Sequence, residues 1–156
     1  MALAFDHGPS FAFDKAAGTP CPNLAPNFTC TIHETLAQQG FPGCTRYDCK
    51  GAGQRISTEV FPHENWRDTP SRKADILDAF ATLRRVHEGL ELIQTAEKLP
   101  LPADKRAELA KITAHYLPET PWTPESLARF DADHLPTRLA TFLRSLAPLV
   151  PRSACA

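Results

Sequence analysis

The feature that most constrains the fold is a long stripe of apolar residues in the middle of the chain. Beyond Thr69 these residues recur at steps of three and four, which is the repeat of one face of an α-helix. The stripe consists of Ile76, Leu77, Phe80, Leu83, Val86, Leu90, Ile93 and Ala96. Pro100 and Pro102 follow it, and proline cannot continue a helix because it lacks an N–H donor. The pattern predicts one amphipathic helix over residues 71–98.

Three shorter helices are predicted after this one. The first begins near Pro102 and stops before Pro118. The second opens at Thr123, a cap residue with proline at the next position, and ends near Phe130. The third covers residues 135–147. Because the connections are short, neighbouring helices should pack antiparallel. The sequence therefore predicts an all-α fold, a small antiparallel helical bundle with a cysteine-rich metal knuckle at its N-terminal side.

The charge balance excludes some classes of partner. The chain has 156 residues, with 17 Lys and Arg against 18 Asp and Glu, so its net charge is −1. This balance gives no electrostatic support to a nucleic-acid partner. No run approaches the 18 or so apolar residues of a transmembrane helix, and the first residues lack the cationic start of a secretory signal. We expect a cytoplasmic protein without a transmembrane segment.

The chain is expected to divide by composition into four stretches. An irregular arm carries Phe5, Phe11 and Phe13, which could dock on the body of the protein or on a partner. The metal-binding segment and the bundle are expected to form one compact domain. The stretches are the arm at 1–20, the cysteine-rich segment at 21–55, the helical bundle at 56–150 and a tail at 151–156.

Four of the five cysteines lie within 29 residues, at Cys21, Cys30, Cys44 and Cys49. In a reducing compartment, clustered thiols favour metal ligation over disulfides. Four thiolates from separate loops can bind zinc tetrahedrally or hold an iron–sulfur cluster. We expect zinc, with an iron–sulfur cluster as the alternative. Reduced structural or redox-active thiols, and disulfides, are the other interpretations.

The residues between these cysteines predict a short helix. Thr31 and Glu34 form a capping-box pattern, and Gly40 suits the end of the helix. Cys30 would then precede the helix N-terminus, where free N–H groups favour a thiolate. His33 would share a face with Cys30, so it could replace one cysteine as a metal ligand or donate a hydrogen bond to a thiolate.

The same segment resembles a known family. The runs CPNL, CTIHETL and GFPGCTRYDCKGAGQR look like the N-terminal cysteine-rich segment of many bacterial pentapeptide-repeat proteins, and so do W-R-x-x-P and LRRVHEGLELI. The resemblance covers roughly residues 20–98. The CP-x-L and C-x-I-H-E portion is also similar to a cysteine-cluster family described as zinc- or iron-chelating. These resemblances imply a metal on the four cysteines with His33 nearby. No tandem A-(D/N)-L-x-x array is present, so a role of the repeat helix does not carry over.

Weaker patterns receive structural interpretations. Residues 50–55 resemble a phosphate-binding loop but lack its GK[ST] ending, so a turn is predicted, with Gln54 and Arg55 free to bond thiolates or loop carbonyls. Residues 55–61 are predicted to form a short extended piece. His87 lacks the second histidine of an HExxH motif, so we expect it to pack against the core or the knuckle.

Two pairs of residues are interpreted in the same way. Trp66 and Trp122 are expected to cover the core rather than to stack on a ligand. Asp131 and Asp133 could bind a cation, but capping of the last helix is the simpler prediction.

Three functional hypotheses follow. The first is a non-enzymatic metal-binding protein, in which the four-thiolate site organises an interaction module for a protein partner on the helical body. The second is an iron–sulfur protein in electron transfer or redox sensing. The third is a thiol-dependent enzyme in which Cys44 or Cys49 pairs with His33.

Overall fold

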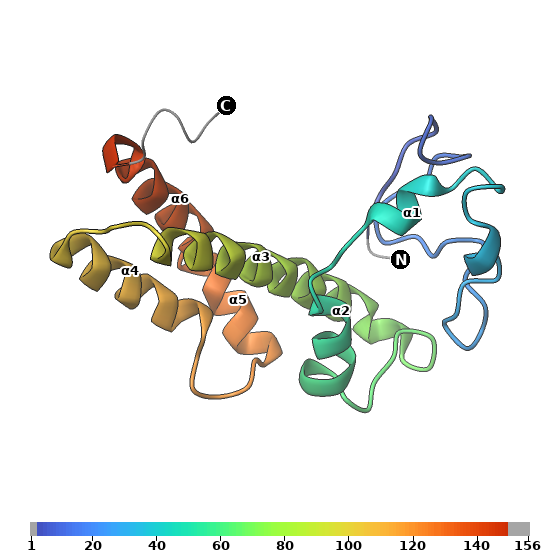
Figure 1. The fold of residues 1–156 in the computed structure, drawn as a ribbon. Helices are drawn as coiled ribbons and strands as arrows, with labels where there is room; N and C mark the ends of the chain where they lie inside the picture. Colours follow the sequence, from blue (N-terminus) through green and yellow to red (C-terminus); the bar gives the residue numbers. More distant parts are fainter. Residues whose placement is uncertain (1–2, 150–156) are drawn as a thin grey trace. The chain divides into compact units, whose positions relative to one another are not determined.

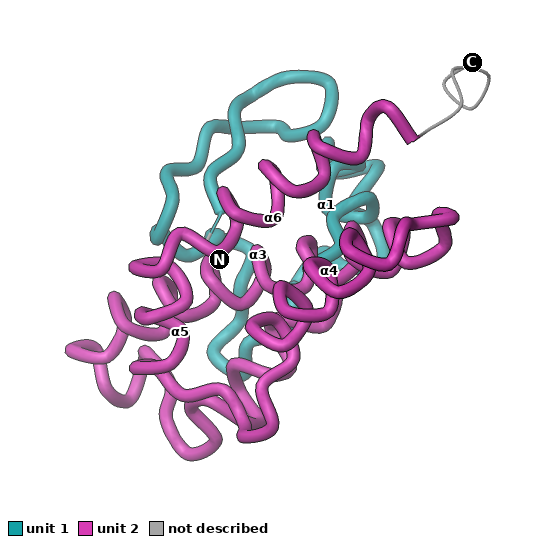
Figure 2. Tube along the Cα trace, turned by 90° about the vertical axis from the view of Figure 1, so that its left-hand side faces the viewer, with its two compact units in different colours: residues 1–49 teal, residues 50–156 magenta. Residues whose placement is uncertain are grey.

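The computed structural model describes residues 3–149 and divides the chain into two compact units, Met1–Cys49 and Lys50–Ala156. Figure 2 distinguishes the two units by colour. The described part contains helices and isolated β-bridges but no β-strand, so the all-α prediction is confirmed. No helix within residues 3–149 combines the length and the apolar character needed to cross a membrane. The predicted tail at 151–156, with Cys155, lies outside the described residues.

The larger unit is organised around the long helix α3, which packs against α2, η2, α4, α5 and α6 (Figure 1). Its elements are α2 (Ala52–Arg55), the π-helix η2 (Ile56–Val60), the 3-10 turns η3 (Pro70–Arg72) and η4 (Ala147–Leu149), α3 (Lys73–Glu97), α4 (Ala103–Tyr116), α5 (Pro124–Ala132) and α6 (Leu135–Ser145). The four helices predicted from residue 71 onward are therefore confirmed, with ends that differ by a few residues.

The core of this unit is built from the predicted apolar faces. In α3, Leu83 and Val86 are fully buried and Ile93 is almost so. The other helices contribute buried residues such as Leu127 and Leu139, which join the same cluster. Trp122 is buried in it and Trp66 packs against it, as predicted for both tryptophans. Burial of these apolar side chains is the main favourable term that holds the helices together.

The start of α5 follows the predicted cap. The Thr123 hydroxyl accepts a hydrogen bond from the Ser126 backbone N–H, and the Ser126 hydroxyl accepts one from the Thr123 N–H. Pro124 occupies the first turn, where its missing N–H costs nothing because that group has no partner within the helix. This reciprocal cap fixes where the chain enters α5.

The extended piece predicted at residues 55–61 is wrong, because this stretch is helical. Gly51 takes φ +80° before α2, and the chain continues directly into the π-helix η2. The Phe61 N–H donates to the Ile56 carbonyl at 2.8 Å, which closes the wide turn. Ile56 and Val60, four positions apart, are both buried in the core. Tertiary burial of this face has overridden the strand preference of β-branched residues.

The smaller unit contains two short helical segments, η1 (His33–Thr35) and α1 (Pro42–Arg46), between loops. Its first residues fold back on themselves, since the backbone groups of Phe5 and Lys15 exchange hydrogen bonds of 3.0 and 2.8 Å. A smaller bridge joins Gly8 and Phe11 inside this loop. The N-terminal arm is therefore an ordered part of this unit.

Aromatic rings form the apolar centre of the smaller unit. The Phe5 ring stacks on Phe11 with centroids 4.3 Å apart, and the Phe13 ring meets Phe41 edge-on at 5.0 Å. Phe41 is 4% exposed and Leu36 is 8% exposed. These rings pack on one another and on Phe41 within the smaller unit, so docking of the arm on the helical body or on a partner stays a prediction.

The capping box predicted at Thr31 is wrong. The Thr31 hydroxyl and backbone N–H both donate to the Asn23 carbonyl, at 3.1 and 2.9 Å, so the hydroxyl is not available to cap a helix. The helical segment begins two residues later, at His33, and no side chain caps it. Gly40 has φ +84°, as expected for the glycine that ends this stretch.

Candidate functional site

Backbone turns bring the first two predicted ligands to the base of one loop. The Leu24 N–H donates to the Cys21 carbonyl at 3.0 Å, and Leu24 forms an antiparallel bridge with Cys30. Inside the loop, Asn27 accepts hydrogen bonds from the hydroxyl and the N–H of Thr29. The eight residues between the two cysteines thus form a hairpin, and Leu24 at its base contacts the backbone of both Cys21 and Cys30.

Cys44 lies on α1 and is electrostatically coupled to this loop. Cys44 is an exposed residue, but partial burial of its thiol raises the pKa of that group, and the neighbouring Cys21 and Cys30 raise it further. The Cys44 N–H donates to the Phe41 carbonyl at 3.1 Å, which ties the start of α1 to the aromatic cluster. Three of the four predicted thiol ligands therefore influence one another.

A buried lysine lies in the same neighbourhood. Lys15 is 7% exposed, and its ammonium group donates to the carbonyls of Ala16 and Thr19 at 3.1 and 3.0 Å. Burial lowers the pKa of Lys15, whereas the Cys21 thiol raises it. No periodic pattern or motif in the sequence marks this lysine.

The predicted ligands do not form a closed metal site in the described residues 3–149. Cys21, Cys30, Cys44 and Cys49 all carry reduced sulfur, and His33 is an exposed residue of η1. Among residues 3–149, no three or more His, Cys, Asp and Glu side chains converge as they would around a metal ion. The donor chemistry suits zinc or iron, but the ligands would have to move to complete a tetrahedron.

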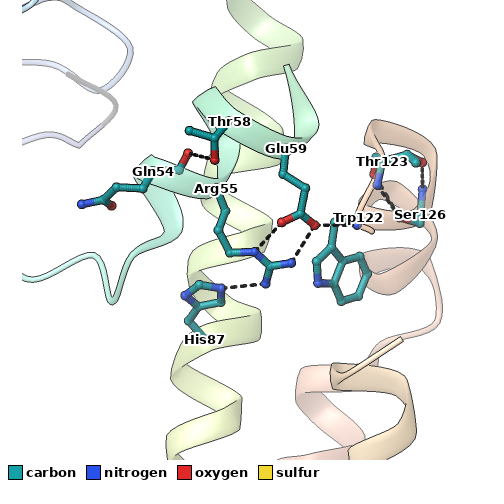
Figure 3. Close-up of polar contacts among 8 residues, drawn as sticks. All are labelled: Gln54, Arg55, Thr58, Glu59, His87, Trp122, Thr123 and Ser126. Atoms are coloured by element: carbon teal, nitrogen blue, oxygen red, sulfur yellow. Dashed lines mark hydrogen bonds and ion pairs between the residues drawn. The ribbon is translucent and has the colours of Figure 1, made fainter. Parts of the chain in front are cut away.

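A second group of polar residues lies in the larger unit, where Arg55 of α2 contacts Glu59 of η2 and His87 of α3 (Figure 3). Its guanidinium donates two hydrogen bonds to the Glu59 carboxylate, at 2.8 and 2.7 Å, and contacts Nε2 of His87 at 3.3 Å. Glu59 also accepts a hydrogen bond of 2.9 Å from the Trp122 backbone N–H. This network connects the stretch that contains α2 and η2 to α3 and to the loop before α5.

The hydrogen bonds of His87 define which of its nitrogens carries the proton. Nδ1 lies 2.5 Å from the Lys50 carbonyl oxygen, which can only accept, so Nδ1 is the donor. Nε2 then accepts from Arg55. Both ring nitrogens form hydrogen bonds to protein groups, so His87 has a structural role. It ties α3 to Lys50 and Arg55, which follow the last cysteine of the segment. Arg55 bonds Glu59 and His87, rather than the thiolates or loop carbonyls considered from the sequence.

The Arg55–Glu59 pair predicts a loss of stability in acid. The hydrogen bond from Arg55 holds the pKa of Glu59 below its ordinary value of 4.5. A lowered carboxyl pKa contributes stability that is complete above pH 4.5 and is lost as the pH falls through the lowered pKa of the folded state. We expect Glu59→Gln to cost about 1 kcal/mol at pH 7.

Urea unfolding of both proteins at a series of pH values measures this contribution. The difference in free energy of unfolding between wild type and Glu59→Gln should shrink as the pH falls below 4.5. Glu119→Gln serves as a control, because Glu119 is an exposed glutamate in the loop between α4 and α5. A difference that stays constant down to the acid limit would contradict a stabilising ionised Glu59.

The capping role predicted for Asp131 and Asp133 is wrong. The Asp131 carboxylate accepts a hydrogen bond of 2.7 Å from the buried Thr82 hydroxyl and forms an ion pair with Arg85. Asp133 ends α5, and His134, with φ +52°, occupies the position before α6 without a side-chain cap. The carboxylate at 131 is thus used to hold α5 against α3, a contact between residues 49 positions apart.

The sequence matches no family model and no solved structure. It is similar to the uncharacterized protein YybG of Bacillus subtilis (strain 168), with 37% identity over 109 residues. These residues cover 70% of this chain and 39% of YybG, so the chain spans well under half the length of that relative. The similarity brings no substrate, cofactor or partner to this chain.

Proposed function

We propose that this chain is a non-enzymatic metal-binding protein in which Cys21, Cys30, Cys44 and Cys49 bind one zinc ion. The observation that carries the proposal is the gathering of all four cysteines in the smaller unit, where backbone bonds close the loop between Cys21 and Cys30 and both lie close enough to Cys44 to act on its thiol. Thiolates that repel one another are held together most effectively by a shared cation.

Metal binding would complete the packing of the smaller unit. Its apolar centre consists of a few phenylalanines and Leu36, which is a small core for a folded unit. Zinc ligation supplies folding free energy directly, because the ligand set exists only in the folded chain. Closure of the loop at Cys30 onto α1 at Cys44 would organise the surface of this unit for a protein partner. His33, which lies on η1 between these two cysteines in the sequence, would hydrogen-bond a ligand or replace one.

The raised pKa of Cys44 supports a ligand role over a catalytic one. A nucleophilic cysteine needs a lowered pKa, usually from an adjacent cation or histidine. Burial and the two neighbouring thiols act in the opposite direction on Cys44. A metal ion removes this barrier, since it binds the thiolate and displaces the proton.

Elemental analysis of protein purified without chelator tests the proposal. We expect one zinc per chain, with Cys30→Ser and Cys49→Ser each losing the metal because a thiolate is replaced by a weak hydroxyl ligand. Cys155→Ser is the matched control and should retain the zinc. His33→Ala should retain most of the metal if the imidazole only hydrogen-bonds a thiolate, and lose it if the imidazole is a ligand.

Far-UV circular dichroism of each variant separates loss of the site from general unfolding, because the long helices lie in the larger unit. Full metal content in Cys30→Ser or Cys49→Ser would remove that residue from the ligand set. Wild-type protein that contains iron and inorganic sulfide in place of zinc would favour the iron–sulfur hypothesis. Protein that takes up neither metal would overturn the proposal.

A further inference from the structure

A groove between α4 and α6 of the larger unit is lined by cations and hydroxyl groups. Its volume is about 430 Å³. The polar groups that matter here are Lys105 and Lys111 of α4, and His134, Thr137, Arg138 and Thr141 along α6 and the residue before it. The groove lies far in sequence from the cysteine segment, and nothing in the metal proposal depends on it.

One cation of this groove is bonded to neighbouring side chains, whereas two others are not paired with a carboxylate of the described residues. Lys105 is held by Glu108 at 3.0 Å and by the Ser145 hydroxyl at 3.1 Å. Lys111 and Arg138 are exposed, and neither forms an ion pair with any residue in the described range 3–149. Glu108 is the one carboxylate of the lining. The groove therefore presents a local excess of positive charge on a chain whose net charge is −1.

The spacing of these cations suits an extended ligand better than a single small anion. Lys105 and Lys111 are six residues apart on one helix, so their backbones are separated by about 9 Å along its axis. Side chains two apart in an extended peptide point to the same face and are separated by about 7 Å, so two such acidic side chains can be reached by lysines that are about 9 Å apart along the helix. A single phosphate or sulfate ion would require cations that converge on one point.

Recognition in this groove would be mainly polar. Ile112 and Phe142 form part of its floor, but they are 7% and 3% exposed, so little apolar surface remains to be covered. Thr137 and Thr141 lie one turn apart on α6 and are exposed, so they can exchange hydrogen bonds with a peptide backbone. Charge complementarity therefore defines the occupant.

We propose that the groove between α4 and α6 binds an acidic segment of a partner protein. The carboxylates of that segment would form ion pairs with Lys111 and Arg138, and with the end of the groove at Lys105. The guanidinium of Arg138 can hold a carboxylate through two parallel hydrogen bonds. A second carboxylate two residues along the segment lies on the same face and reaches the Lys105 end of the groove. Such rim charges govern association rate and specificity, and their effect weakens as salt rises.

Fluorescence anisotropy with a labelled ten-residue peptide tests this proposal. The peptide has glutamates at alternate positions, so that they share one face, with leucine and serine between them. We expect saturable binding to the wild-type chain at low salt, and no binding of the same peptide with glutamines in place of its glutamates. The double variant Lys111→Glu, Arg138→Glu should weaken binding about tenfold or more. Glu108→Gln should strengthen binding, because it removes the carboxylate that faces the ligand.

Arg129→Glu is the matched control, since Arg129 is an exposed cation of α5 that does not line this groove. Circular dichroism and Tm should show that all variants remain folded. Equal weakening by Arg129→Glu would mean non-specific attraction and would overturn the proposal, as would absence of binding to the wild type. Competition by inorganic phosphate at matched ionic strength would assign the groove to small anions, and would also overturn it.

Discussion

Replacement of Gly89 by alanine is expected to lower the free energy of unfolding of the larger unit by about 2 kcal/mol or more. A Cβ at position 89 would overlap Cε1 of the Tyr116 ring and lie 3.0 Å from its Cδ1 and Cζ atoms. Tyr116 is 1% exposed and its ring meets Phe130 edge-on at 4.9 Å, so it has no free space into which to move. The close approach of α3 and α4 at this point therefore depends on a residue without a side chain.

Two opposing effects determine the size of this change. Alanine is favoured over glycine inside a helix by about 1 kcal/mol, which alone would stabilise α3. Overpacking in a close-packed core costs typically 1–3 kcal/mol, and more where neighbours cannot shift. Because Tyr116 is enclosed, the steric cost should exceed the helix propensity gain. Burial also raises the pKa of Tyr116 to about 12, which is a separate sign of how completely the phenol is removed from water.

Chemical denaturation followed by tryptophan fluorescence measures the effect, since Trp66 and Trp122 both lie in the larger unit. Gln94→Ala, at an exposed position of the same helix, should change stability by less than about 0.5 kcal/mol. In a Tyr116→Ala background the added methyl of Gly89→Ala should cost far less, because the ring that opposes it is gone. An unchanged midpoint for Gly89→Ala alone would show that the ring moves without cost.

The helices of the larger unit could be predicted because their signals are local and agree with one another. The stripe from Ile76 to Ala96 has the helical repeat, and its prolines mark the end. Thr123 and Pro124 carry a complete start signal within two residues. In each case the pattern of burial and the chemistry of the ends favour the same structure, which is the condition under which sequence reasoning succeeds.

Prediction failed where a side chain had a distant partner that competes with the local motif. Thr31 begins a capping-box pattern in the sequence, but its hydroxyl donates to the carbonyl of Asn23 instead of capping a helix. Asp131 lies at the end of α5, shortly before α6, but its carboxylate accepts hydrogen bonds from Thr82 and Arg85, which are 49 and 46 residues away. A single sequence contains no information on which of two chemically equivalent partners will be nearer, because that choice depends on the packing of whole helices.

The candidate site was predictable in composition and not in geometry. The gathering of four thiols within 29 residues indicated that Cys21, Cys30 and Cys44 would lie in one neighbourhood. The buried Lys15 beside Cys21 had no signal, since one lysine in a loop resembles any other. Arg55 and Glu59, at i and i+4, could have been recognised as a helical ion pair if the stretch had been predicted as a helix. Their link to His87, 32 residues away, required the fold.

Replacement of Phe130 by alanine is the other change expected to have a large effect, with a loss of about 3–5 kcal/mol. Phe130 is 2% exposed and its ring lies between Tyr116 and Trp122, with edge-to-face contacts of 4.9 and 5.8 Å. Its removal would leave a cavity that joins α4, α5 and the loop before α5. Edge-to-face aromatic pairs contribute about 0.5–1.5 kcal/mol beyond the area they bury, so loss of both pairs adds to the cavity cost.

A series at this position separates volume from aromatic geometry. Phe130→Leu keeps most of the volume and should cost about half as much as Phe130→Ala or less, with the remaining loss assigned to the two ring contacts. Leu117→Ala is the matched control, because Leu117 is 58% exposed and follows Tyr116 directly. Since Trp122 touches Phe130, its emission in the folded state should shift in Phe130→Ala and stay unchanged in Leu117→Ala. If Phe130→Ala unfolded at the same denaturant concentration as Leu117→Ala, the three rings would not form the centre of this core, because removal of a central ring must expose its neighbours to a void.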